Sequence, residues 1–316
     1  MFTSIWEDIK REYNYGNMVT RIIIINIGVF VLVNLVWVIL RLTHAYTTPP
    51  LYHSIIHFFS LSSDWVHNLT HPWVWITSMF LHEGFMHILF NMLFMYWFGR
   101  IVGDFIGNHR ILPLYLLGGL VGGLAFFLSI NLLPYDTTGA THYALGASGA
   151  VMGIVVAAGV LSPDYLMHLP FVGGVKLKFI VGILILLDLV GLAGDTNTGG
   201  HFAHIGGALF GWIFVWQLRE GNDWSAPISN LIDRIRSFFQ GLGNFGNRAK
   251  GPKMVYKNPN KSRATKSRRP QNGTDQPVDL SHQERVDAIL DKIKKSGYES
   301  LTSEEKEFLF NASKEK

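Results

Sequence analysis

The stretch GASGAVMGIVVAAGVL, residues 146–161, carries the strongest information about the fold of this chain. It is an apolar run that follows a glycine-rich turn. From Ser148 to Leu161 it is shorter than the about 20 residues that a helix needs to cross a membrane. Irregular backbone is not tolerated against lipid. The turn before Ser148 should therefore lie below the membrane surface, in a cavity walled by protein.

Five longer apolar runs surround this short one. They are Ile22–Leu42, Gly84–Ile106, Ile111–Leu133, Leu177–Ala193 and Gly200–Leu218. Of the 316 residues, 48% are hydrophobic and 16% are charged, and almost all of the charge lies outside these runs, which argues against a soluble protein. We predict an all-α polytopic membrane protein, a bundle of six transmembrane helices whose short fourth helix starts at re-entrant depth.

The basic residues predict the orientation of this bundle, because Lys and Arg concentrate on cytoplasmic loops. The loops 43–84, 134–147 and 194–200 contain neither residue, whereas the alternate loops and both chain ends carry them. Both termini are therefore expected in the cytoplasm, with Arg41 as an exception that can snorkel to the interface. No targeting sequence is recognisable, so we expect an integral protein of the bacterial inner (plasma) membrane.

The first outer loop is unusually aromatic for a loop. Between residues 43 and 84 it contains Trp65, Trp73 and Trp75 together with several Phe and Tyr residues. Aromatic side chains with a polar edge favour the membrane–water interface. We expect short helices that lie in the outer surface of the membrane.

Polar residues inside apolar runs are candidates for function, because burying them in a membrane is costly. His87 and Asn91 are four residues apart, so they share one helix face, and both can donate hydrogen bonds. Such a pair could equally hold two helices together. The sequence His82–His87 is similar to the zinc motif HExxH but is one residue too long. A five-residue step turns the two histidines about 140° apart, so we expect no metal there.

A serine and a histidine supply a second set of candidates. The chain has no cysteine, which excludes a thiol nucleophile and a Cys-ligated metal. Ser148 opens a helix, where free backbone N–H groups favour developing negative charge. Its surroundings are similar to the GxSxG turn of soluble hydrolases, but residue 150 is alanine and no sheet is expected. His204 lies inside the last apolar run.

The spacing of small residues gives Ser148 and His204 a reason to meet. Small residues recur every four positions in both segments: Gly149, Gly153 and Ala157 in one, and Ala203, Gly207 and Gly211 in the other. Such stripes allow two membrane helices to approach closely. Ser148 precedes one stripe and His204 follows the first residue of the other. If the stripes pack, the serine lies within reach of a base that can take its proton.

Three motifs together resemble the rhomboid family of intramembrane serine proteases, over about residues 70–220. The pattern HxxxxHxxxN is matched by His82, His87 and Asn91, GxSG by Gly146, Ser148 and Gly149, and AHxxGxxxG by Ala203, His204, Gly207 and Gly211. The resemblance is to six-span bacterial members, here with a cytoplasmic extension at the C-terminus. It implies a rhomboid-like bundle that needs no cofactor and cleaves transmembrane protein substrates in or near their helices.

The resemblance also implies roles for these residues. Ser148 would be the nucleophile and His204 the general base, acting as a dyad. His87, Asn91 and the backbone N–H of Ser148 would form the oxyanion hole, with Gly146 in the same turn and His82 in a supporting position. No third catalytic member is expected, and we interpret Asp188 and Asp195 as structural, because Asp188 is predicted near the other end of its span from His204.

Two other functions remain open at this point. A catalytically silent rhomboid-like binder of membrane proteins predicts the loss of Ser148 or His204, and both are present. A transporter that uses the intramembrane His and Asn predicts internal repeats, and the sequence has none that we recognise.

The sequence predicts four regions. Residues 1–20 form a cytoplasmic segment and 21–220 the membrane domain. Residues 221–280 read as a disordered basic linker that contacts anionic lipid, at about 1 kcal/mol per basic residue; we expect no nucleic acid there, because no aromatic residues are interleaved. Residues 281–316 form a small helical hairpin, whose second helix is capped by Thr302 or Ser303. The hairpin could either bind a partner or stabilise the protein, and the sequence does not decide between these roles.

Overall fold

The computed structural model describes residues 2–44, 47–133, 139–169, 172–194, 197–244 and 282–312. The chain forms two compact units, Met1–Ala249 and Lys250–Lys316, and each is described by itself. Asp195 and most of the predicted basic linker lie outside the described residues.

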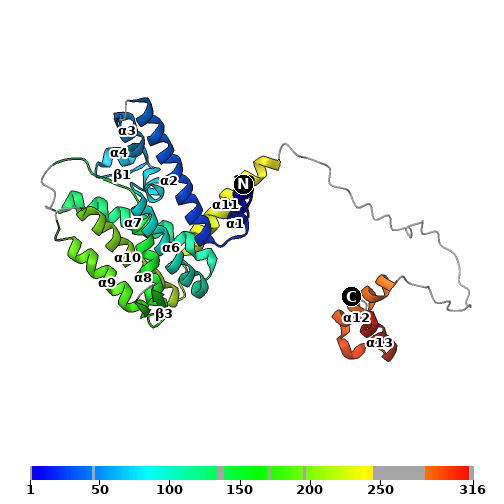
Figure 1. Ribbon diagram of the computed structural model, residues 1–316. Helices are drawn as coiled ribbons and strands as arrows, with labels where there is room; N and C mark the ends of the chain where they lie inside the picture. Colours follow the sequence, from blue (N-terminus) through cyan, green and yellow to red (C-terminus); the bar gives the residue numbers. More distant parts are fainter. Residues whose placement is uncertain are drawn as a thin grey trace, which may run out of the picture. The chain divides into compact units, whose positions relative to one another are not determined.

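The first unit is built around a bundle of six helices, which confirms the predicted all-α polytopic membrane fold (Figure 1). They are α2 (Met18–Thr43), α6 (Phe85–Ile106), α7 (Ile111–Leu132), α8 (Ser148–Leu161), α9 (Leu177–Gly191) and α10 (Thr198–Arg219). Among the described residues, Met18–Thr43, Phe85–Ile106 and Asn108–Leu132 are long and apolar enough to cross a membrane. The sequence prediction that α8 is too short to do so is confirmed.

Helix α8 lies at the centre of the bundle. Every residue from Gly149 to Gly159 is buried, and α8 contacts α6, α7, α9 and α10. A helix that is apolar on all sides is expected to be enclosed by others. Helix α2 behaves in the opposite way, since Val31, Leu32 and Leu35 are more than half exposed, as expected for side chains that face lipid.

Glycines allow α8 and α10 to pack backbone against backbone. A Cβ atom added to Gly207 would collide with the carbonyl oxygen of Gly149, and one added to Gly211 with that of Gly153. Helix α7 joins the same contact, because a Cβ on Gly122 would lie 2.7 Å from the carbonyl oxygen of Ala203. The two small-residue stripes are therefore at the interface of these helices.

This packing predicts that a Gly→Ala substitution has opposite effects on stability at two positions. Gly207→Ala should destabilise the protein by about 3 kcal/mol or more, because its methyl group has no space beside Gly149. The matched control is Gly182→Ala on α9, where no atom lies within 4 Å of the new Cβ. It should stabilise the helix by about 0.5–1 kcal/mol. Thermal unfolding in detergent measures both, and a Gly207→Ala protein as stable as wild type would contradict the packing.

The segment between α2 and α6 contains short helices and pairs with the chain before Ser148. It contains α3 (Pro50–Phe59), α4 (Trp65–Thr70), α5 (Val74–Thr77) and the 3-10 helix η1 (Ser78–Phe80). Strand β1 (Leu61–Ser62) pairs antiparallel with β2 (Tyr143–Ala144), with Leu61 opposite Ala144. After α8 in the sequence, β3 (Leu166–Leu169) and β4 (Gly173–Lys176) form an antiparallel hairpin. The 3-10 helix η2 (Asn108–Arg110) precedes α7.

Two helices flank the bundle in the sequence, α1 (Phe2–Tyr15) and α11 (Ser225–Asn244). The expectation of a disordered linker from residue 221 is therefore wrong for Ser225–Asn244. A signal for this helix was present, because apolar residues recur there at i, i+3, i+4 and i+7. They are Ile228, Leu231, Ile232 and Ile235. That spacing is typical of an amphipathic helix.

The second unit contains α12 (His282–Ser296), η3 (Tyr298–Ser300) and α13 (Ser303–Ala312). The predicted capping box is confirmed with Thr302 as the cap. The Glu305 N–H donates to Thr302 Oγ1 (3.3 Å), and the Thr302 N–H donates to the Glu305 carboxylate (2.8 Å). Glu305 also forms an ion pair with Lys292 (2.7 Å), which ties the two helices together.

Candidate active site

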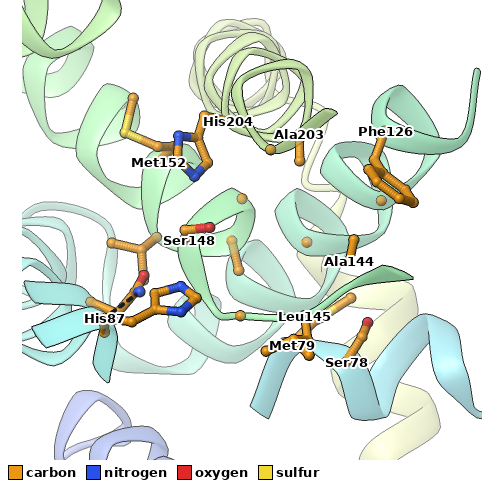
Figure 2. A pocket seen from close by; sticks show the side chains of 18 of the residues that line it. Ser78, Met79, His87, Phe126, Ala144, Leu145, Ser148, Met152, Ala203 and His204 are labelled. Carbon is orange, nitrogen blue, oxygen red and sulfur yellow. Dashed lines mark hydrogen bonds between the residues drawn. The ribbon is translucent and has the colours of Figure 1, made fainter. Parts of the chain in front are cut away.

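A cavity of about 780 Å³ lies among α6, α7, α8, α9 and α10. Its lining brings together residues from all three sequence motifs: His87, Asn91, Gly146, Ser148, Gly149, Ala203 and His204. Figure 2 shows His87, Ser148 and His204 turned toward this one cavity. Met152, one helical turn after Ser148, lines it as well.

The turn before Ser148 has a shape that only glycine provides. Gly146 has φ +130°, a backbone conformation that other residues rarely adopt. A Cβ at this position would also lie 2.8 Å from His87 Nε2. The glycine therefore lets the backbone pass close to the imidazole of His87, and the chain then enters α8 with Ser148 as its first residue.

Two hydrogen bonds hold this turn against the segment that precedes α6. The Gly146 N–H donates to the Ser78 carbonyl oxygen (2.8 Å), and the Ala147 N–H donates to His82 Nε2 (3.4 Å). These bonds fix the two residues before Ser148. Ser148 is the first residue of α8, so its N–H has no partner within the helix. It can therefore donate a hydrogen bond to a ligand.

A buried tyrosine fixes the segment against which the turn is held. The Tyr115 hydroxyl donates to the Met79 carbonyl oxygen (2.9 Å) and accepts a long hydrogen bond from Asn26 Nδ2 (3.4 Å). Both side chains are fully buried. Because a buried polar group costs free energy unless it is paired, this network of α2 and α7 sets the position of Met79, next to Ser78 and thus to the serine turn.

His82 is placed where it can support this turn. It lies before α6, outside the membrane-spanning helices, and is only 4% exposed. Burial lowers the pKa of His82 to about 4, so its imidazole is neutral at physiological pH and Nε2 can accept the Ala147 N–H. Its Nδ1 is buried without a hydrogen-bond partner among the described residues.

His87 and Asn91 line the cavity from α6. One N–H of the Asn91 amide donates to the His87 carbonyl oxygen (2.8 Å). A side-chain amide has two such hydrogens, so the second remains for a group in the cavity. His87 is partly buried beside the Gly146 backbone. Both residues can therefore present donors to an oxygen near Ser148.

His204 is paired with a carboxylate that we did not expect there. Its Nδ1 lies 2.8 Å from Asp188 Oδ1, and His201 Nδ1 lies 2.8 Å from the same oxygen. The expectation that Asp188 lies near the other end of its span is wrong. Helix α9 ends soon after Asp188, the chain reverses, and α10 begins shortly before His201, so all three residues share one end of a helical hairpin.

This pairing sets the tautomer of His204. A carboxylate only accepts hydrogen bonds, so both imidazoles donate Nδ1–H to Asp188. The Nε2 atom of His204 is then the one with a lone pair, which is the form that a general base needs. Sequence reasoning did not single out His201, although it stands one turn before His204 on the same helix face.

Two family models match parts of this chain. A family model described as Rhomboid domain matches residues 69–221. A second model, described as a family of unknown function (DUF6576), matches residues 280–315.

Curated relatives match over part of their length. The chain is 30% identical over 154 residues to the mitochondrial presenilin-associated rhomboid-like protein A of Danio rerio, covering 47% of this chain and 37% of that protein. It is 33% identical over 157 residues to the mitochondrial RHOMBOID-like protein 12 of Arabidopsis thaliana, covering 46% of each. The chloroplastic Rhomboid-like protein 11 of the same plant matches at 27% over 186 residues, 52% of this chain and 60% of the relative.

These names contradict the expected location. We expected a bacterial plasma membrane because no targeting sequence was recognisable. The relatives are mitochondrial or chloroplastic by name, and they point to an organellar membrane instead.

Proposed function

Because the chain belongs, through residues 69–221, to the rhomboid family, we propose that it is an intramembrane serine endopeptidase. It hydrolyses peptide bonds in or near transmembrane segments of membrane proteins. The observation that carries the proposal is the single cavity in which Ser148 opens α8 and His204 is held by a carboxylate. A silent binder has no need of a base in this tautomer.

The proposed reaction uses the residues that share this cavity. Ser148 Oγ attacks the carbonyl carbon of the scissile bond, and its proton passes to His204 Nε2. Asp188 stabilises the imidazolium through the Nδ1–H hydrogen bond. His204 then gives the proton to the leaving amine. A water molecule, activated by the same imidazole, attacks the acyl-enzyme and releases Ser148.

The negative charge of the intermediate develops on the carbonyl oxygen. The Ser148 N–H, His87 and the second N–H of Asn91 are the donors around the cavity that can stabilise it. Such preorganised donors contribute most where the protein shields them from bulk water. His82 and Gly146 take no part in the chemistry in this account; they shape and hold the turn.

Removing one oxyanion donor should lower kcat with little change in KM. For His87→Ala or Asn91→Ala we expect a loss of about 10²–10³-fold. The matched control is Asn34→Ala. Asn34 on α2 makes the same hydrogen bond to the carbonyl oxygen four residues earlier (2.8 Å) but does not line the cavity. Its kcat should equal that of wild type, and an equal loss in both asparagine variants would contradict the role of Asn91.

The proposed function itself is tested with purified protein and a single-span substrate in the same liposomes. The substrate helix should contain small residues that let it unwind, and the products are identified by mass spectrometry. We expect cleavage in or near the helix that persists in EDTA. Binding of several such substrates without any cleavage would favour the silent binder, and cleavage that EDTA abolishes would favour a metalloprotease.

A further inference from the structure

One feature of the site is not used by the reaction: a second imidazole shares the carboxylate of the catalytic histidine. Asp188, His201 and His204 each offer one ligand atom, and these atoms all lie within 4.8 Å of one another. The side chains are 10%, 23% and 22% exposed. They are thus partly enclosed but not sealed, and Asp188 and His204 line the cavity.

The donor set suits zinc. Two imidazole nitrogens and a carboxylate oxygen bind Zn²⁺ at about 2.0–2.2 Å in a tetrahedral arrangement, which places the ligand atoms about 3.4 Å apart. The two hydrogen-bonded distances of 2.8 Å need to open by only about 0.6 Å to reach it. Mg²⁺ and Ca²⁺ prefer oxygen ligands, so this site should discriminate against them.

The backbone already holds the ligands in place. His201 and His204 are three residues apart on α10 and therefore neighbours on one face, while Asp188 comes from the facing helix α9. Three protein ligands leave a fourth position for water. A metal ion would replace the two protons that the imidazoles donate to the carboxylate, between ligand atoms that already lie within 4.8 Å of one another.

We propose that Asp188, His201 and His204 form an inhibitory site for Zn²⁺, a proposal that rests on the proposed protease function. Zinc binds the Nδ1 lone pair of His204, so the proton of the neutral imidazole moves from Nδ1 to Nε2. Nε2 then carries a hydrogen and cannot accept the proton of Ser148. The metal-bound and catalytic states use the same nitrogen and exclude each other.

Binding is tested first, without reference to activity. The probe is Co²⁺, added to tag-free Ser148→Ala protein in detergent, because four-coordinate Co²⁺ gives an intense visible absorption band. We expect the band, its displacement by one equivalent of Zn²⁺, and its loss in Ser148→Ala variants that also carry His201→Gln or Asp188→Asn. His67→Gln, at a histidine on α4, is the control and should keep the band. No band, or a band unchanged by His201→Gln, would overturn the site.

Inhibition is tested by cleavage with and without Zn²⁺, each variant being compared with its own metal-free rate. Wild type should be inhibited by Zn²⁺ but not by Mg²⁺, and EDTA should restore its rate. His201→Gln should need at least about tenfold more Zn²⁺. If the absorption band forms but Zn²⁺ leaves the cleavage rate unchanged, or cleavage requires Zn²⁺, the inhibitory mechanism is overturned. If wild type never cleaves but the band forms, the protease function fails and the metal site stands.

Discussion

Replacing Ser148 by alanine is expected to reduce cleavage of a membrane-embedded substrate by at least about 10³-fold, to the limit of detection. His204→Ala should have a loss of the same order, since without the base the serine hydroxyl remains a weak nucleophile. The double variant should lose no more than either single variant, because the two residues act as one unit. Rates in liposomes at saturating substrate measure all three.

The result depends on the fold being kept. Alanine is smaller than both residues, and neither makes a hydrogen bond that holds the bundle together in the described part of the chain, apart from the pairing of His204 with Asp188. Thermal unfolding of each variant should therefore stay close to that of wild type. Losses of the two variants that multiply in the double variant would mean that Ser148 and His204 act independently, against the dyad.

Replacing Asp188 by asparagine should lower kcat by about 10²–10⁴-fold with little change in KM. The amide can donate a hydrogen to His204 Nδ1, which leaves the proton on Nε2, the wrong tautomer for a base. In soluble serine proteases the corresponding change costs about 10⁴. Asp188 acts through His204, so we regard it as a positioning residue.

A purely structural role for Asp188 would look different. In that case Asp188→Asn would lower the unfolding temperature without a selective effect on kcat, and Asp188→Glu would not restore the cleavage rate. We expect Asp188→Glu to recover part of the rate, because a carboxylate restores the acceptor for Nδ1–H. In a Ser148→Ala background, Asp188→Asn should cause no further loss. A kcat equal to that of wild type in Asp188→Asn would remove Asp188 from the mechanism.

The sequence predicted those parts of the site that depend on local patterns. The short apolar run from Ser148 and the four-residue spacing of Gly149, Gly153, Gly207 and Gly211 follow from helix geometry alone. The fold class and the capping box at Thr302 were confirmed for the same reason. Each of these features is encoded within one or two helical segments.

The remaining features depend on how distant segments meet. Asp188 was predicted near the other end of its span from His204, whereas the packing of α9 against α10 brings the two side chains together. The same packing also brings His201 into hydrogen-bond contact with Asp188. The helix of Ser225–Asn244 was missed because its basic composition was given more weight than its apolar spacing. The location was wrong because it rested on the absence of a recognisable targeting sequence, which does not distinguish one membrane from another.

Labelling with a fluorophosphonate shows whether Ser148 is a nucleophile activated by His204, and it requires no assumption about the substrate. We expect the probe to modify Ser148, as identified by mass spectrometry of the purified protein in liposomes. Labelling should be absent in Ser148→Ala and strongly reduced in His204→Ala. If the folded wild-type protein is not labelled, or is labelled equally at other serines, Ser148 is not an activated nucleophile.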